Sequence, residues 1–169
     1  MLAHAVFGLL LSASVVPQSV EQLTDRSTHV VRAQVATVQS AREPGPAGIY
    51  TRSTLSVSEW LKGKPLPSVS LRQAGGKIGA ESVELPGDAA LQPGEEVLAF
   101  LRCDPGADHC SLVGLAQGKY HLERDEKGAV QARRDFRQTA FVNGAPLSPG
   151  PEPYAALAAR VRARAGSGK

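Results

Sequence analysis

The sequence predicts a mainly β fold, built as one small barrel with a short helix before it and an amphipathic helix after it. About seven or eight short segments alternate between apolar and polar residues, which is the pattern of strands with one buried face. Gly and Pro turns separate these segments at roughly 8 to 12 residues, a spacing typical of all-β domains. The chain has 169 residues, 42% of them hydrophobic, which is enough for one domain with a core and excludes a disordered chain.

A closed sheet has no exposed edges, so an OB-like barrel, closed or partly open, is the first choice of architecture. A β-sandwich is the alternative. The expected organisation is a signal peptide at residues 1–14, the barrel domain at 15–150, and a C-terminal helix and tail at 151–169.

The first segment has the features of a cleavable signal peptide. Residues 1–16 contain no Lys, Arg, Asp or Glu, and residues 5–11 form an apolar run too short to cross a bilayer. Small residues at 12–14 suit signal peptidase, so we expect cleavage after Ser14, with cleavage after Ala13 as the alternative. The basic residue that usually precedes the apolar run is missing. We therefore expect a secreted or periplasmic protein with no stable membrane insertion after cleavage.

The next elements follow from capping and alternation. Ser19, with Gln22 three residues later, forms a capping box and predicts a helix of about two turns that ends near Ser27. Alternation predicts a strand at residues 29–38 and the longest strand at residues 49–61. Shorter strands are expected at residues 68–73, 81–85, 96–102, 111–115, 119–124 and 129–133.

Cys103 and Cys110 are separated by six residues that include the turn pair Pro-Gly, and the segments on either side resemble strands. The two cysteines should therefore meet at the mouth of a hairpin loop, close enough to bridge. In an exported chain we expect a disulfide. A metal site would recruit His109 as a third ligand, but the neighbouring sequence offers no fourth.

The C-terminal segment predicts a short helix from residue 153 to 164. Tyr154, Leu157 and Val161 recur at helical spacing, and arginines fill the last turns, where the helix dipole favours cations. We expect this helix to dock on the barrel, with a membrane-surface helix as the alternative. The formal net charge is only +3 and the basic residues are scattered, so we expect no nucleic-acid partner.

No motif in the sequence indicates catalysis. The glycine-rich residues 73–79 lack the spacing of a phosphate loop, and neither a Gly-x-Ser-x-Gly turn nor a histidine pair with metal-ligand spacing occurs. We therefore predict no catalytic residue, no metal ligand and no cofactor. Loops carry function in β barrels, so ligand contacts are expected at Gly75, Gly76, Lys77 and Asp88.

Three functions are compatible with these features. The leading one is a non-enzymatic binding or interaction module whose partner is an envelope or extracellular protein or glycan. The second is a secreted hydrolase that uses His29 or His121 with a carboxylate; a pocket holding such a pair within hydrogen-bond reach would favour it. The third is a structural component of an envelope complex, docked through residues 153–169.

The central segment resembles small exported bacterial proteins of unassigned activity. The matching pieces are residues 27–35, 49–51, 57–63, 75–76 and 93–101. More distantly, the segment is similar to the OB-like netrin and metalloproteinase-inhibitor (TIMP-like) domain, which also has a first strand, a threonine-rich strand, a Lys-Gly turn and a later Gly-Glu…Phe strand. The resemblance spans about residues 27 to 101 and implies an OB-like fold.

The resemblance does not extend to the inhibitory mechanism. Those inhibitors chelate a protease zinc through an N-terminal cysteine, whereas the mature terminus expected here is Val15, followed by Val16 and Pro17. The cysteine framework differs as well. The resemblance therefore implies the fold alone.

Overall fold

A computed structural model of the chain describes residues 14–136, 139–142 and 150–167. The expected signal peptide, apart from Ser14, lies outside the described residues. Among the residues that are described, no helix is both long and apolar enough to cross a membrane. The elements, in chain order, are β1 (Ser14–Val15), α1 (Val20–Arg26), β2 (His29–Arg42), β3 (Ile49–Lys62), β4 (Ser68–Ala74), β5 (Gly76–Ile78), β6 (Glu81–Val83), β7 (Glu96–Cys103), β8 (Cys110–Leu112), the 3-10 helix η1 (Leu115–Gly118), β9 (Lys119–Arg124), β10 (Val130–Arg133), β11 (Ala140–Phe141), β12 (Glu152–Pro153) and α2 (Tyr154–Gly166).

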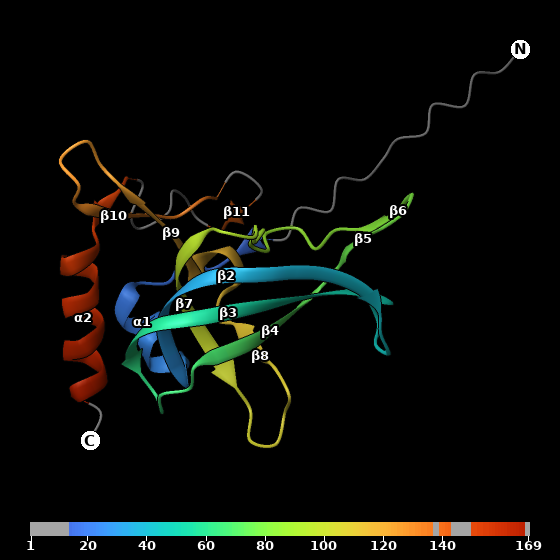
Figure 1. The fold of residues 1–169 in the computed structure, drawn as a ribbon, viewed down its shortest axis with the longest axis horizontal. Coiled ribbons are helices and arrows are strands. Elements are labelled where there is room, and N and C mark those ends of the chain that lie inside the picture. The colour runs from blue at the N-terminus through green and yellow to red at the C-terminus, as the bar shows by residue number, and fades with distance from the viewer. Residues whose placement is uncertain (1–13, 137–138, 143–149, 168–169) are drawn as a thin grey trace, which may run out of the picture.

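Five strands close into a barrel in the order β2, β3, β4, β8, β7 and back to β2 (Figure 1). Every contact in this ring is antiparallel except that between β4 and β8, which is parallel. A five-stranded barrel whose third and fifth strands run parallel has the arrangement of the OB fold. The predicted OB-like barrel is confirmed, in its closed form, and the sandwich alternative is wrong.

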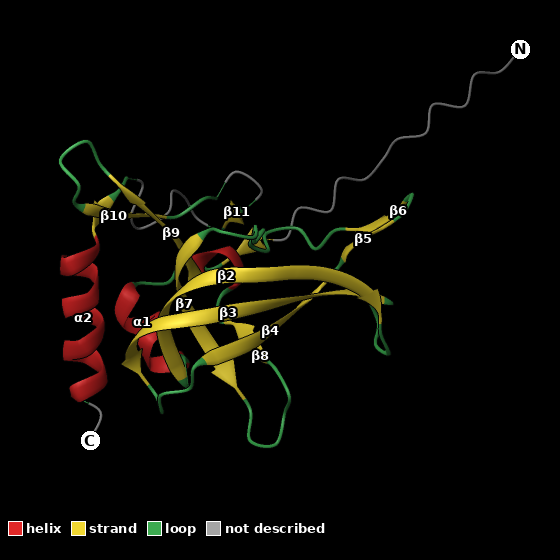
Figure 2. Ribbon diagram, viewed as in Figure 1, coloured by secondary structure: helices red, strands yellow, loops and turns green. Residues whose placement is uncertain are grey.

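Strand β7 has apolar side chains on both faces and separates two cores. Val97, Ala99 and Leu101 point into the barrel interior, while Leu98 and Phe100 point to a second core under the helices. Figure 2 shows α1 and α2 side by side along the end of the barrel where this second core lies. The fold is therefore a barrel with a helical layer packed against one side.

Both helices agree with their predictions. Gln22 donates its backbone N–H to the Ser19 hydroxyl, and its side chain accepts the Ser19 N–H, which completes the capping box of α1. Helix α2 docks on the barrel and buries Leu157 and Val161 completely. The arginines of α2 form ion pairs with the rest of the chain: Arg160 with Glu21 and Glu152, Arg162 with Glu59, and Arg164 with Asp25.

The structure differs from the expected strands in four places. The strand expected at residues 81–85 ends at Val83. Strand β2 continues to Arg42, beyond the expected end at residue 38, because its backbone keeps pairing with β3 after the apolar alternation stops (Figure 1). Strand β3 has almost the expected bounds, and β4 pairs with it along residues 50–56. The strand expected at 111–115 ends at Leu112, since positive φ angles at Gly114 and Leu115 turn the chain into η1. The glycine-rich stretch contains a short strand, β5, paired with β6.

The disulfide between Cys103 and Cys110 is confirmed. The two residues are direct register partners of β7 and β8, with Cα atoms 4.2 Å apart. Since β8 is the strand that closes the barrel, the bridge lies at its closure.

Candidate ligand-binding cleft

A polar surface continues the inner face of the barrel along β9 and β10. In the sheet register, Ala99 of β7 is opposite Lys119, and Val97 is opposite His121. His121 in turn is opposite Arg133 of β10. Residues directly opposite on adjacent strands present their side chains to the same face. The face that is apolar at β7 therefore becomes basic beyond the barrel.

The segment 88–95 and residues after β10 line this surface to form what we call the β9–β10 cleft. The cleft has two adjoining parts that share Ala90, Lys119, His121, Arg133 and Asp135. The inner part, of about 370 Å³, also includes Asp88, Ala89, Ala116 and Thr139. The outer part, of about 710 Å³, also includes Gln92, Pro93, Glu95 and Arg134. Both volumes fall in the range of sites that bind small ligands.

Glu95 lines the outer part of the cleft and engages two of its basic side chains. Its Oε1 atom accepts from Lys119 Nζ at 2.5 Å and lies 3.0 Å from His121 Nδ1, while its Oε2 accepts the Gln92 N–H at 3.1 Å. Lys119 also donates to the carbonyl of Ala90 at 2.5 Å. The side chains of Glu95 and Lys119 are only 10% and 14% exposed. Glu95 thus holds two basic side chains in place without a ligand.

The rim of the cleft is more open. The side chains of His121 and Arg133 are 38% and 55% exposed. Both approach Glu123, whose Oε2 atom is 3.5 Å from an Arg133 nitrogen and 3.9 Å from His121 Nε2. These distances are at or beyond the limit of a hydrogen bond, so Glu123 engages Arg133 and the outer nitrogen of His121 only weakly.

Asp88 lies at the inner end of the cleft, where burial raises the pKa of its carboxyl group despite a hydrogen bond from the Ala89 N–H. The Gln73 side chain donates to the carbonyl of Ala89 at 2.7 Å and holds this segment on the barrel. A partly buried acceptor at this position suits a hydroxyl or amine donor of a ligand.

The structure separates the four residues at which ligand contacts were expected. Asp88 lines the cleft, whereas Gly75, Gly76 and Lys77 lie on the β5 hairpin and are not among its lining residues. Gly76 has a backbone reason to be glycine, because a Cβ atom there would lie 2.4 Å from Ser40 Oγ. A ligand site at residues 75–77 stays a prediction.

Glu95, Lys119, His121 and Arg133 were not predicted from the sequence as one group. Their signal was the alternation of residues 119–123, in which buried Tyr120 and Leu122 leave the polar residues on the other face. Which loop would cover that face depends on long-range pairing of β7 with β9, which no local pattern encodes.

The two histidines of the hydrolase hypothesis have different surroundings. His29 hydrogen-bonds the neighbouring Thr28 hydroxyl and packs edge-on against Trp60, and burial lowers the pKa of its imidazole. His121, by contrast, pairs with a carboxylate inside a cleft. Within the described residues, no three His, Cys, Asp or Glu side chains gather closely enough to hold a metal ion. No protein-family model matches the chain, and no curated protein does.

Proposed function

We propose that the protein is an exported, non-enzymatic binding module that takes its ligand in the β9–β10 cleft. The observation that carries this proposal is the buried Glu95, which holds Lys119 and His121 on two sides before any ligand arrives. Side chains that are already ordered reduce the entropic cost of binding. Their position on a rigid sheet supports a specific site rather than a general polar surface.

Export is supported by two features. The bridge between Cys103 and Cys110 is of a kind typical of oxidising compartments. The apolar segment with small residues before Val15 has the pattern of a signal peptide. A secreted or periplasmic location would place the cleft among envelope or extracellular glycans and proteins, from which we expect its ligand.

The test is a steric block of the cleft with a matched control. Ala90 is exposed and lines both parts of the cleft, so Ala90→Trp fills it without removing a charge. Ala156→Trp places the same side chain on an exposed position of α2. Each purified protein is immobilised and incubated with the envelope fraction and medium of the producing cells. We expect wild type and Ala156→Trp to retain a glycan or protein that Ala90→Trp does not; equal retention by all three proteins would refute the proposal.

A specific observation also favours the hydrolase as a second candidate. Glu95 engages Nδ1 of His121, which leaves Nε2 as the nitrogen that could accept a proton from water. The test is turnover of ester, phosphoester and glycoside substrates, compared with His121→Gln. Hydrolysis that His121→Gln abolishes would establish this function, and absence of turnover by the wild type would eliminate it.

The third hypothesis gives α2 a docking role outside the chain. The apolar face of α2 is already buried against its own barrel, through Leu157 and Val161 among others. We therefore expect deletion of residues 153–169 to unfold the domain. A folded barrel that has lost only its localisation would instead support the structural role.

A further inference from the structure

We infer that the outer part of the β9–β10 cleft binds an oxyanion, carried by a ligand that also offers hydroxyl groups, as an acidic saccharide does. This inference rests on the proposed binding function and specifies the ligand's chemistry. The outer part is lined by four basic side chains, Lys119, His121, Arg133 and Arg134, and by the acidic residues Glu95 and Asp135.

The charged side chains of the cleft differ in how fully other protein groups already engage them. Glu95 is almost buried and accepts from Lys119, His121 and the Gln92 N–H, so its carboxylate is already satisfied by the protein. Lys119 is likewise engaged by Glu95 and the Ala90 carbonyl. In the part of the chain that the structure describes, the less engaged basic groups are the guanidinium of Arg133, 3.5 Å from Glu123, and that of Arg134, beside the imidazole of His121.

Arg134 provides an independent observation. Its guanidinium carbon lies 4.9 Å from the centre of the Tyr120 ring and 5.1 Å from that of Phe136. Its Nε atom is buried and has no hydrogen-bond partner in the part of the chain that the structure describes. Because that Nε atom is buried, a ligand in the cleft would meet this guanidinium through its terminal nitrogens, while the two aromatic rings hold the group in place.

Glu123 indicates how an oxyanion would meet the rim. Its Oε2 atom forms only long contacts, of 3.5 Å with Arg133 and 3.9 Å with His121. A ligand oxyanion could approach the Arg133 guanidinium at hydrogen-bond distance, because such groups bind oxygens through two parallel N–H donors. The imidazolium form of His121 would add a third donor through Nε2. Asp88, at the inner end, is an acceptor for a hydroxyl group of the same ligand.

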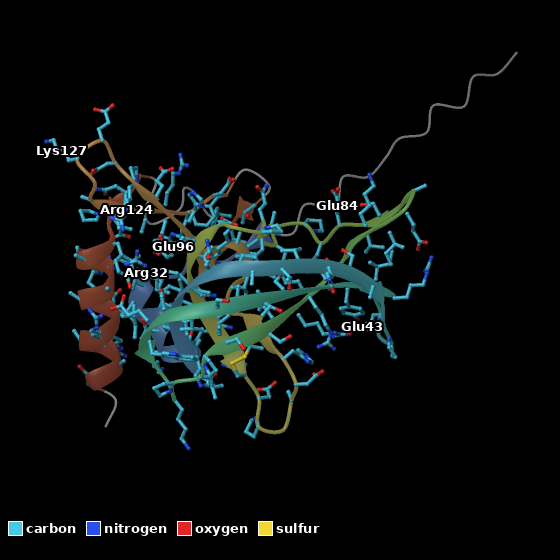
Figure 3. The ribbon with its side chains drawn as sticks, viewed as in Figure 1. Arg32, Glu43, Glu84, Glu96, Arg124 and Lys127 are labelled. Carbon is cyan, nitrogen blue, oxygen red and sulfur yellow. A yellow bond between two sulfur atoms is a disulfide. The ribbon has the colours of Figure 1, made fainter. Side chains whose placement is uncertain are left out.

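The test uses the mature protein and small probes at constant ionic strength, so that general screening does not change. Sodium sulfate, sodium phosphate and galacturonate are titrated while the NMR signals of residues 119–134 are followed, and galactose is the neutral counterpart of galacturonate. The variants are Arg133→Gln and Arg134→Gln. Lys127→Gln removes one charge from the tip of the same hairpin, where Lys127 projects away from the barrel (Figure 3), outside the cleft.

We expect saturable binding of at least one oxyanion, weakened about tenfold or more in Arg133→Gln and Arg134→Gln and unchanged within about twofold in Lys127→Gln. The preferred probe identifies a carboxylate, sulfate or phosphate ligand. Absence of binding, equal loss in Lys127→Gln, or equal binding of galactose and galacturonate would overturn the inference. If Ala90→Trp loses its natural ligand while both arginine variants keep it, the binding function stands and the oxyanion inference fails.

Discussion

The side-chain carbonyl of Gln117 accepts the backbone N–H of Gln18 at 2.7 Å, across 99 positions of sequence. The amide nitrogen of the same side chain donates to the carbonyl of Val16 at 3.1 Å. Gln117 is 1% exposed. The buried side-chain amide of Gln117 therefore hydrogen-bonds the backbone of residues 16–18, just after the expected cleavage site, in the way that a neighbouring strand would.

Replacing Gln117 with Ala should destabilise the protein by about 1 to 3 kcal/mol, because the backbone groups of Val16 and Gln18 lose their partners. Urea unfolding measures this change in the free energy of unfolding. Gln39→Ala, at an exposed position of β2, is the control and should stay within about 0.5 kcal/mol of wild type. Equal stability of the two variants would contradict a clamp by Gln117.

Glu43 should make stability depend on pH in the acid range. Hydrogen bonds from Arg52 and then Arg72 lower the pKa of its carboxyl group from 4.5 to about 2. The ionised form therefore favours the folded state above about pH 5, and this contribution is lost as the pH falls from about 4.5 to 2. Thermal melting measured from pH 7 to 2 should show a smaller fall in melting temperature at acid pH for Glu43→Gln than for wild type. Glu84→Gln, at an exposed glutamate on the β6 side (Figure 3), should behave like wild type.

Reduction of the Cys103–Cys110 bridge should lower stability. The bridge closes a loop with a sequence separation of 7, and a loop of this size suggests a contribution of about 2 kcal/mol. Urea unfolding with and without reductant measures the loss. The double variant Cys103→Ala, Cys110→Ala should have a lower urea midpoint than oxidised wild type, and reductant should not change that midpoint. If reductant does not change the urea midpoint of the wild-type protein, the bridge makes no such contribution.

Gly76→Ala tests whether the glycine-rich stretch serves the backbone. The added Cβ atom would lie 2.4 Å from Ser40 Oγ and 2.5 Å from Thr51 Oγ1, so we expect a loss of about 2 to 3 kcal/mol. At Gly79, whose φ is also positive, a Cβ atom would meet nothing within 4 Å, and Gly79→Ala should cost about 1 kcal/mol. Thermal denaturation compares the two. A stable Gly76→Ala protein that no longer retains its ligand would support the predicted contacts at residues 75–77 instead.

The sequence predicted the fold well where one face of an element is buried. The alternation of Val31, Ala33 and Val35 and the capping box at Ser19 are local patterns, and the structure has both as expected. The end of β2 was predicted less accurately, because β2 pairs with β3 as far as Arg42, after its own apolar alternation has stopped. Backbone pairing, which leaves no sequence period, sets that end.

The cleft could be predicted only in part. Asp88 was expected as a contact because it lies in a loop, and it does line the cleft. Glu95 and His121 are 26 positions apart and meet only because β7 pairs with β9, so neither residue type alone indicated the pair. Gly75 and Gly76 were expected as contacts because they lie in a glycine-rich loop, whereas Gly76 allows a close approach of the backbone to Ser40.

Strand β7 has a consequence for how the protein unfolds. Because its two faces contribute to both apolar clusters, neither the barrel nor the helical layer can lose its packing while the other remains intact. The two layers should melt together in one cooperative transition, with coincident changes in backbone circular dichroism and in the fluorescence of Trp60, which packs beside the barrel cluster.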